Sequence, residues 1–217
     1  MNLKPLLIAG AVAIAGIAGY TWLNKMPMTG MDHSAMSDGP SAAESTKGFE
    51  AAMTSMMKGM MVAPTGKPDL DFMQGMIPHH QGAIDMAKVV LKFGKDAEVK
   101  TLAENVIKAQ ESEIAFMTDW LAKANTSTFV ASPEATKQNA DAMQVMMKSM
   151  MTPYTDDADT DFIKGMIPHH QGAIDNAKVA IKFAKDPAVL KLASEIIAAQ
   201  ESEITFMTEW LKRNGKQ

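Results

Sequence analysis

The strongest constraint on the fold is a tandem repeat, because the second half of the chain restates the first. The segment FMQGMIPHHQGAIDMAK begins at Phe72, and FIKGMIPHHQGAIDNAK begins at Phe162. Downstream, AQESEIAFMTDWL begins at Ala109 and AQESEITFMTEWL begins at Ala199, so the offset is 90 residues both times (162 − 72 and 199 − 109). Two copies are too few for a solenoid but sufficient for one pseudo-symmetric bundle.

Each copy has the periodicity of three helices. Residues 49–61 carry methionines at i, i+3, i+4, i+7 and i+8, which is an amphipathic helical stripe. The second predicted helix spans residues 69–93, and the third spans residues 97–124. Pro78 lies inside the second helix, as Pro168 does in the other copy, and is expected to kink the helix or restart it. No run alternates with a period of two residues, so strands are not expected.

Aspartates open several of these helices and are candidate N-caps. Asp69 and Asp159 are expected to cap the second helix of each copy. Asp96 is expected to cap the third helix, and in the second copy Asp186 stands before Pro187, a favoured first helical position for proline.

These elements predict an all-α protein. The two long helices of each copy form a hairpin, and the two tandem hairpins form a four-helix bundle, with the methionine-rich pieces as additional short helices. The first repeat spans residues 49–124 and the second spans residues 139–213. Two small separate bundles are the alternative, but a shared core is preferred because three short helices bury little area alone.

An apolar segment occupies residues 1–23 and carries no charge after Lys4. It fits either a secretory signal peptide or a membrane anchor. Tyr20 and Trp22 suit the interfacial belt of an anchor, whereas the short cationic start and small residues fit a signal. Both interpretations place the rest of the chain in the periplasm or another extracytoplasmic compartment, and an anchor would hold it at the inner membrane.

Residues 24–48 have the composition of a flexible linker rich in Met, Ser, Gly, Pro and Asp. The linker contains MPMTGMDHSAM, which includes Met31, His33 and Met36. A linker has no core for methionine to fill, and thioether sulfur suits Cu(I) and Ag(I). These three residues are therefore candidate ligands, and a linker with accidental methionines is the alternative.

Composition narrows the chemistry further. The chain has no cysteine, which excludes disulfides, zinc–thiolate sites and iron–sulfur clusters. A formal net charge of −4 leaves no basic excess for nucleic acid. The chain has 21 methionines, several times the average usage. Neither a catalytic motif nor the Glu-x-x-His spacing of di-iron bundles is present, so an enzyme is not expected.

Four of the five histidines form two adjacent pairs, His79–His80 and His169–His170, each within GMIPHHQGAID. Neutral imidazole is a good metal ligand. Adjacent helical residues point about 100° apart, so a distortion at the preceding proline would be needed to aim both rings at one point. The alternative is a pair of polar residues near a helix start, bonded to the backbone or to neighbouring side chains.

Methionines share a helix face with the second histidine of each pair. Met76 and Met73 precede His80 by four and seven residues. Met166 precedes His170 by four residues, but isoleucine holds the remaining place, so the first copy has the richer ligand set. Imidazole with thioether suits Cu(I), whereas hard ions favour carboxylates and carbonyls. The alternative is that these methionines fill the core.

Acidic residues near the histidines are candidates to orient the rings. Asp85 and Asp175 are expected to hold an imidazole through its second nitrogen. Glu113 and Glu203 are expected to be surface groups or groups that contact a metal ligand without touching the metal.

The GMIPHHQGAID motif, followed by a helix that contains QESEI, resembles a bacterial helical-bundle family long labelled as a domain of unknown function, which includes a copper metallochaperone. The similarity covers about residues 50–211 in both copies. It implies a ferritin-like four-helix bundle in the periplasm or on the cell surface. In the copper-binding members, monovalent copper or silver is held in the bundle core by two consecutive histidines. The resemblance therefore implies that His79, His80, His169 and His170 are the ligands.

These observations predict an exported protein that binds Cu(I), and also Ag(I), for copper sequestration or metallochaperone transfer in metal resistance or homeostasis. The expected partners are copper ions and a copper efflux or sensor protein. Nucleic acid is not an expected partner, and a membrane is contacted only through the N-terminal segment. Two alternatives remain: a metal- or haem-dependent oxidase on a helical bundle, and a metal-free bundle that binds a partner through methionine-rich faces.

Overall fold

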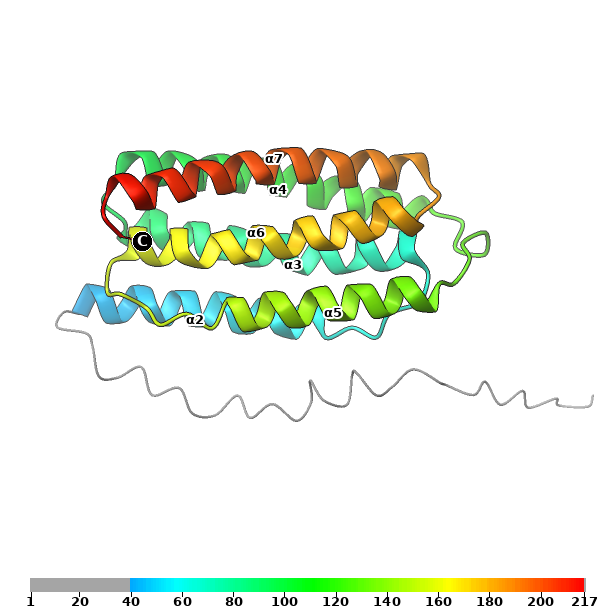
Figure 1. Ribbon diagram of the computed structural model, residues 1–217, viewed down its shortest axis with the longest axis horizontal. Helices are drawn as coiled ribbons and strands as arrows, with labels where there is room; N and C mark the ends of the chain where they lie inside the picture. Colours follow the sequence, from blue (N-terminus) through cyan, green and yellow to red (C-terminus); the bar gives the residue numbers. More distant parts are fainter. Residues whose placement is uncertain (1–39, 217) are drawn as a thin grey trace, which may run out of the picture. The chain divides into compact units, whose positions relative to one another are not determined.

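The computed structural model describes residues 40–216, with side chains from residue 44 onward. Within this range the chain forms six helices and no strand (Figure 1). The helices are α2 (Pro40–Met60), α3 (Pro68–Phe93), α4 (Ala97–Lys123), α5 (Pro133–Ser149), α6 (Ala158–Phe183) and α7 (Pro187–Arg213). The prediction of an all-α fold is confirmed.

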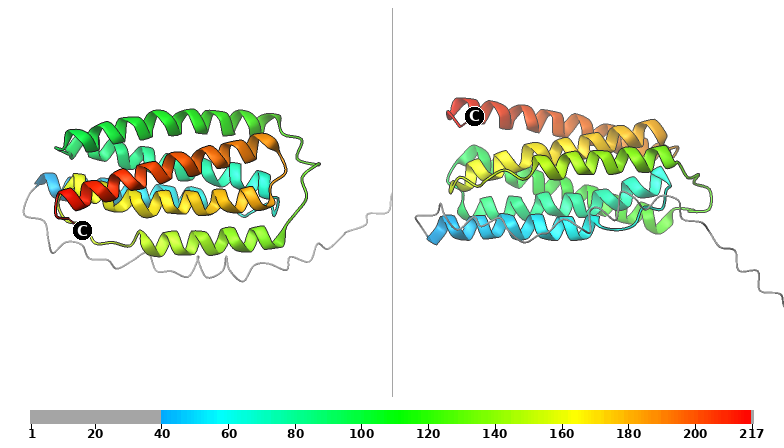
Figure 2. Two further views of the ribbon diagram at one scale, coloured as in Figure 1. Left: turned by 45° about the horizontal axis from the view of Figure 1, so that its top comes forward. Right: turned by 60° about the horizontal axis from the view of Figure 1, so that its bottom comes forward.

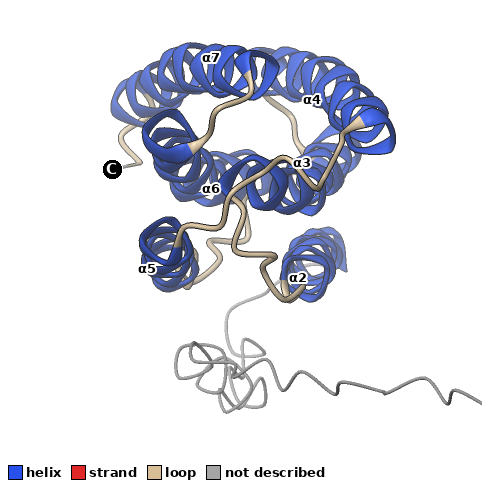
Figure 3. Ribbon diagram, turned by 90° about the vertical axis from the view of Figure 1, so that its right-hand side faces the viewer, coloured by secondary structure: helices blue, strands red, loops and turns tan. Residues whose placement is uncertain are grey.

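Helices α3 and α6 form the middle of the bundle and pack against each other. Helices α4 and α7 lie on one side of this pair, and α2 and α5 lie on the other (Figures 2 and 3). Each repeat therefore contributes one hairpin to a four-helix bundle, and the methionine-rich helices α2 and α5 are added outside it. Because α3 contacts α6, the two repeats share one core and do not form two separate bundles.

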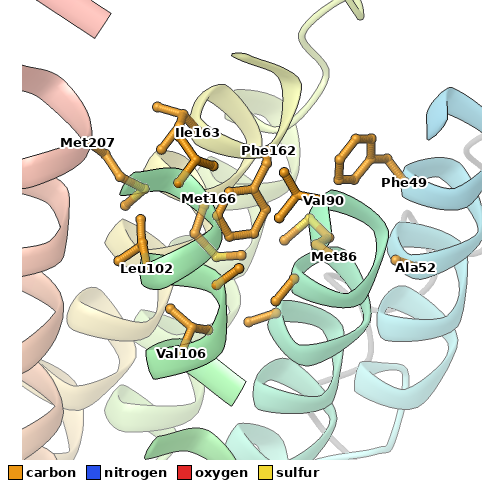
Figure 4. Close-up of a cluster of buried hydrophobic side chains, with 14 of the residues drawn as sticks. Phe49, Ala52, Met86, Val90, Leu102, Val106, Phe162, Ile163, Met166 and Met207 are labelled. Carbon is orange, nitrogen blue, oxygen red and sulfur yellow. The ribbon is translucent and has the colours of Figure 1, made fainter. Parts of the chain in front are cut away.

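The buried apolar residues form two clusters, one on either side of the histidine pairs along α3 and α6. One cluster contains Phe72, Met73 and Met76 of α3 and the alanines of the C-terminal half of α6. The other contains the C-terminal half of α3, the N-terminal half of α6 and the buried methionines of α2 and α5. Figure 4 shows Met86 and Val90 of α3 with Phe162 and Met166 of α6 in this second cluster.

Two of the predicted N-caps are confirmed. The side chain of Asp96 accepts hydrogen bonds from the first turn of α4, and the side chain of Asp186 does the same at α7, with Pro187 as its first helical residue. The prediction that Asp69 and Asp159 cap their own helices is wrong. The N-cap of α3 is Lys67, which makes no side-chain bond, and the N-cap of α6 is Asp157.

Asp69 and Asp159 instead join the two repeats. Oδ1 of Asp69 accepts hydrogen bonds from the backbone N–H groups of Lys185 and Asp186, at 2.9 and 2.8 Å. Oδ2 of Asp159 accepts from the N–H groups of Lys95 and Asp96, at 2.8 and 3.1 Å. The start of each central helix is thus bonded to the end of the other repeat's hairpin turn, which fixes α3 and α6 as antiparallel neighbours.

Helices α3 and α6 continue through Pro78 and Pro168, so no restart occurs. Proline has no N–H group, and its cost inside a helix is usually about 3 kcal/mol. Gly59 of α2 approaches Pro78 so closely that a Cβ at position 59 would lie 2.7 Å from the Cβ of the proline. Packing of α2 against the proline is one contact that stabilises the helix at this position.

The N-terminal boundaries of α2 and α5 differ from the predicted repeat boundaries. Residues 40–48 belong to α2, although their composition resembles that of the linker before them. Ser45 and Phe49 are buried, so tertiary contacts support a helix that composition alone does not indicate. In the second repeat, the Ser132 side chain caps α5 and Pro133 begins it.

The methionine stripes of α2 and α5 contribute to the core, as the packing interpretation predicts. Met56 lies against Gly82 of α3, where a Cβ would be 2.7 Å from its sulfur, and Met146 lies against Gly172 of α6 in the same way. Outside the core, the Phe116 side chain of α4 is 43% exposed.

Candidate metal centre

Both histidine pairs lie at the middle of the central helices and are buried, with at most 1% of each residue exposed. Neighbouring positions on a helix face different directions, but α3 and α6 are covered on several sides. His79 faces α6, where its ring centroid lies 3.8 Å from the ring centroid of His169. His80 faces α4. All four rings are therefore enclosed, although they do not point toward one position.

The four imidazoles form a layer between the two apolar clusters. The ring centroids of His79 and His80 are 6.2 Å apart, and those of His169 and His170 are 6.0 Å apart. With the central contact between His79 and His169, the layer runs from α4 through α3 and α6 to α7. We call these four residues the histidine layer.

The outer rings of the histidine layer are oriented by glutamates. Nε2 of His80 lies 2.6 Å from Oε2 of Glu113, and Nε2 of His170 lies 2.6 Å from Oε2 of Glu203. A carboxylate only accepts, so Nε2 carries the proton and donates it, which leaves the Nδ1 lone pair free to bind a metal. A carboxylate that fixes the tautomer of a metal-binding histidine is a recurrent arrangement.

The expected role of Asp85 and Asp175 is wrong. Asp85 accepts a hydrogen bond from Gln81, and Asp175 accepts one from Gln171. Glu113 and Glu203, expected to be surface groups or groups behind a metal ligand, are partly exposed and each contacts a histidine ring. An antiparallel hairpin with its turn centred at residue 95 places residue 110 opposite residue 80, since 95 + 15 = 110. Glu113 lies within one turn of that position, so the hairpin register contained this signal.

Several ring nitrogens in the histidine layer have no protein partner. Nε2–H of His169 donates to the backbone oxygen of His79, at 3.1 Å. Both ring nitrogens of His79 and Nδ1 of each of the other three rings are buried and unpartnered, five atoms in all. A buried polar group without a hydrogen bond typically costs about 1–3 kcal/mol. Buried ring nitrogens without partners lower the stability of the metal-free fold. The histidine layer is therefore more typical of a ligand-binding site than of a stabilising core.

The central rings are held neutral. Burial lowers the pKa of His79 well below its usual value, and the neighbouring rings of His80 and His170 lower it further. Burial and the nearby histidines lower the pKa of His169 in the same way. A metal binds neutral imidazole, so the enclosure keeps both rings in the form that ligates.

Methionines are buried in both apolar clusters that flank the histidine layer. Met73 and Met76 are buried in one cluster together with Met117 of α4. Met166 is buried in the other cluster together with Met207 of α7 and Ile163. The two copies are thus inequivalent at position 73 versus 163, as the sequence indicates. Met117 and Met207 were not predicted as ligands, although each follows its ring-orienting glutamate by one helical turn.

Within residues 40–216 no three His, Asp or Glu side chains stand in an arrangement that would chelate a metal. Thioether sulfur is not among these groups, and methionines are buried in both clusters that adjoin the histidine layer. The other predicted ligands, Met31, His33 and Met36, lie outside the described residues.

Comparison with known proteins identifies the family to which this all-helical bundle belongs. Residues 69–211 match the family model DUF305, described as a domain of unknown function. The chain belongs to this family, which confirms the family resemblance. A curated relative, uncharacterised protein L153 of Acanthamoeba polyphaga mimivirus, is 42% identical over 59 residues. That match covers 27% of this chain and only 39% of the viral protein.

Solved structures of the family share the fold. CopM in its Cu(I)-bound form is 33% identical, with a TM-score of 0.52, and the match covers 67% of this chain and 96% of CopM. CopM soaked with silver gives the same identity and TM-score, over 67% of this chain and 95% of CopM. A DUF305 protein from Streptomyces coelicolor, described as secreted, is 27% identical with a TM-score of 0.56, over 71% of this chain and 96% of that protein.

Proposed function

We propose that this chain is an exported protein that binds Cu(I), and also Ag(I), in order to sequester the ion or transfer it to a partner. The observation that carries the proposal is the histidine layer, in which buried ring nitrogens lack protein partners while Glu113 and Glu203 fix two of the tautomers. Thioether groups of Met76 and Met166 are buried in the clusters that adjoin it.

The donor set fits a soft monovalent cation. Neutral imidazole nitrogen and thioether sulfur are soft or borderline ligands, which suit Cu(I) and Ag(I). A cation in this layer loses its hydration, and the carboxylates behind His80 and His170 offset part of that cost. Both glutamates are partly exposed, at 22% and 23% of their side chains, so the negative charge lies between the layer and solvent.

Relatives support the ion and the compartment. CopM, which shares this fold, has been solved with Cu(I) and with silver bound. The Streptomyces coelicolor relative is described as secreted, which supports an extracytoplasmic location. No helix within residues 40–216 has the length and apolarity that a bilayer crossing requires. Met31, His33 and Met36 of the N-terminal linker would also capture ions, and a copper efflux or sensor protein would receive them.

The test is an anaerobic competition titration of the full chain against a chromogenic Cu(I) chelator. Glu113→Gln together with Glu203→Gln keeps the shape of both side chains but removes the charge that fixes the rings. We expect the affinity of the buried site to fall by about 10- to 100-fold, the usual effect of losing a group that orients a ligand.

The matched control is Asp85→Asn with Asp175→Asn. These carboxylates lie on the same helices but contact Gln81 and Gln171, not a ring. We expect the control to bind Cu(I) as the parent chain does. Equal losses in the two variants would show that general charge, and not orientation of the histidine layer, controls binding.

A further inference from the structure

A pocket away from the histidine layer is lined by three methionines from separate parts of the chain. Met53 comes from α2, Met86 from α3, and Met150 from the residue that ends α5. Phe49 and Tyr154, whose rings stack with centroids 6.0 Å apart, also line this pocket. None of the four paired histidines lines it. Figure 4 shows Met86 and Phe49 on the same side of the second core cluster.

Core packing accounts for part of this arrangement, because Met86 and Met150 belong to the second core cluster and Met53 packs against it. Methionine is flexible and normally fills irregular gaps. Here three methionines line a space that their side chains do not fill. Met53 is only partly buried, whereas Met86 and Met150 are buried, so the pocket extends from near the surface into the bundle. Three methionines that line one space offer thioether sulfur, which is a donor that suits a soft cation.

A buried carboxylate oxygen adds charge to the same pocket. Asp161 lines it and is 5% exposed. Its Oδ1 accepts hydrogen bonds from the N–H and hydroxyl groups of Thr155, both at 2.7 Å, while its Oδ2 is buried without a partner. Lys164 also lines the pocket, and the described residues contain no ion pair between Lys164 and Asp161.

The duplication supplies an internal comparison. Subtracting or adding 90 places Met143, Asn176 and Met60 at the positions that correspond to Met53, Met86 and Met150. An amide thus replaces the central thioether in the other half of the molecule. The equivalent aspartate also differs, because Oδ2 of Asp71 accepts a hydrogen bond from the N–H of Gly66. Only one half therefore combines three thioethers with an unpartnered carboxylate oxygen.

We propose that Met53, Met86 and Met150 form a second soft-cation site for Cu(I) or Ag(I), with Oδ2 of Asp161 supplying negative charge. The proposal extends the proposed function to another part of the bundle, and it does not require the histidine layer to bind metal. The site would lie nearer to solvent than that layer, in the same apolar cluster as Met166.

The test uses the full chain labelled with ¹³C at the methionine methyl groups, titrated with silver nitrate and followed by methyl NMR. Resonances are assigned with single Met→Leu variants, which conserve volume and usually cost less than about 1.5 kcal/mol. We expect the methyl signals of Met53, Met86 and Met150 to shift together and to saturate with one affinity. Met86→Leu should weaken that affinity by at least about tenfold, since losing even a supporting group has this effect.

Asp161→Asn keeps the Oδ1 acceptor and removes the charge, so it should weaken silver binding while the three signals still shift together. The matched control is Met60→Leu with Met143→Leu, which should leave the titration unchanged. Stationary Met53, Met86 and Met150 signals would overturn the proposal, as would equal responses from Met60 and Met143. Signals of Met76 and Met166 report on the histidine layer separately, so failure of either site is distinguishable from failure of the other.

Discussion

Acidification should destabilise the apo protein through the two central rings of the histidine layer. Burial lowers the pKa of His79 and His169 well below 6.5, the value expected in the unfolded chain. A group whose pKa is lowered in the folded state stabilises the fold above its unfolded pKa, and this contribution is lost as the pH falls. Below pH 6.5, each ring lowers the free energy of unfolding by roughly 1.4 kcal/mol for every unit by which the pH falls. Moving from pH 7.5 to 5.5 should therefore cost about 3 kcal/mol for the pair.

The assay is urea unfolding of metal-free protein at pH 7.5 and 5.5, followed by circular dichroism. The control is His79→Leu with His169→Leu, which removes both titrating rings and should lose most of this pH dependence. Burial raises the pKa of Asp71 and Asp161, so these carboxyls favour folding as the pH falls and oppose the histidines. Both proteins retain them, so their effect cancels in the comparison. Equal pH dependence in parent and variant would refute the inference that the central rings are held neutral by burial.

Three further predictions concern the packing that positions the site. Gly82→Ala should destabilise the fold by about 1–3 kcal/mol in thermal or urea unfolding, because its Cβ would lie 2.7 Å from the sulfur of Met56. Gly75→Ala on the same helix meets nothing within 4 Å and should stabilise by about 0.5–1 kcal/mol; destabilisation there would contradict the packing described. Asp69→Ala leaves two partly buried N–H groups of the opposite repeat without their acceptor and should cost about 1–3 kcal/mol. An unchanged unfolding midpoint would contradict this role of Asp69.

Local signals in the sequence predict most of the helical framework. Periodicity and the 90-residue offset indicate the paired hairpins, and the caps at Asp96 and Asp186 act within their own helices. Asp69 and Asp159 carry the same local signal, but contacts with the other repeat decide their role. The start of α2 was missed for a similar reason, since burial of Ser45 and Phe49 depends on packing against another part of the chain.

The sequence predicts which histidines form the candidate site better than it predicts how their rings are arranged. The doubled histidine pairs are visible in the sequence, but a local helical argument places adjacent rings on different faces. Only the antiparallel packing of α3 and α6 brings His79 against His169. Sequence neighbours favoured Asp85 as the group that orients a ring, whereas the hairpin brings Glu113 to His80. Residues contributed by a second helix require the register between helices, which local spacing does not give.

The most direct measurement is anomalous diffraction from crystals of the full chain grown with silver nitrate. The account predicts a silver peak within bonding distance of at least one unpartnered ring nitrogen of the histidine layer, with Glu113 and Glu203 still bonded to Nε2 of His80 and His170. Silver peaks confined to methionines elsewhere, with the histidine layer empty, would contradict it.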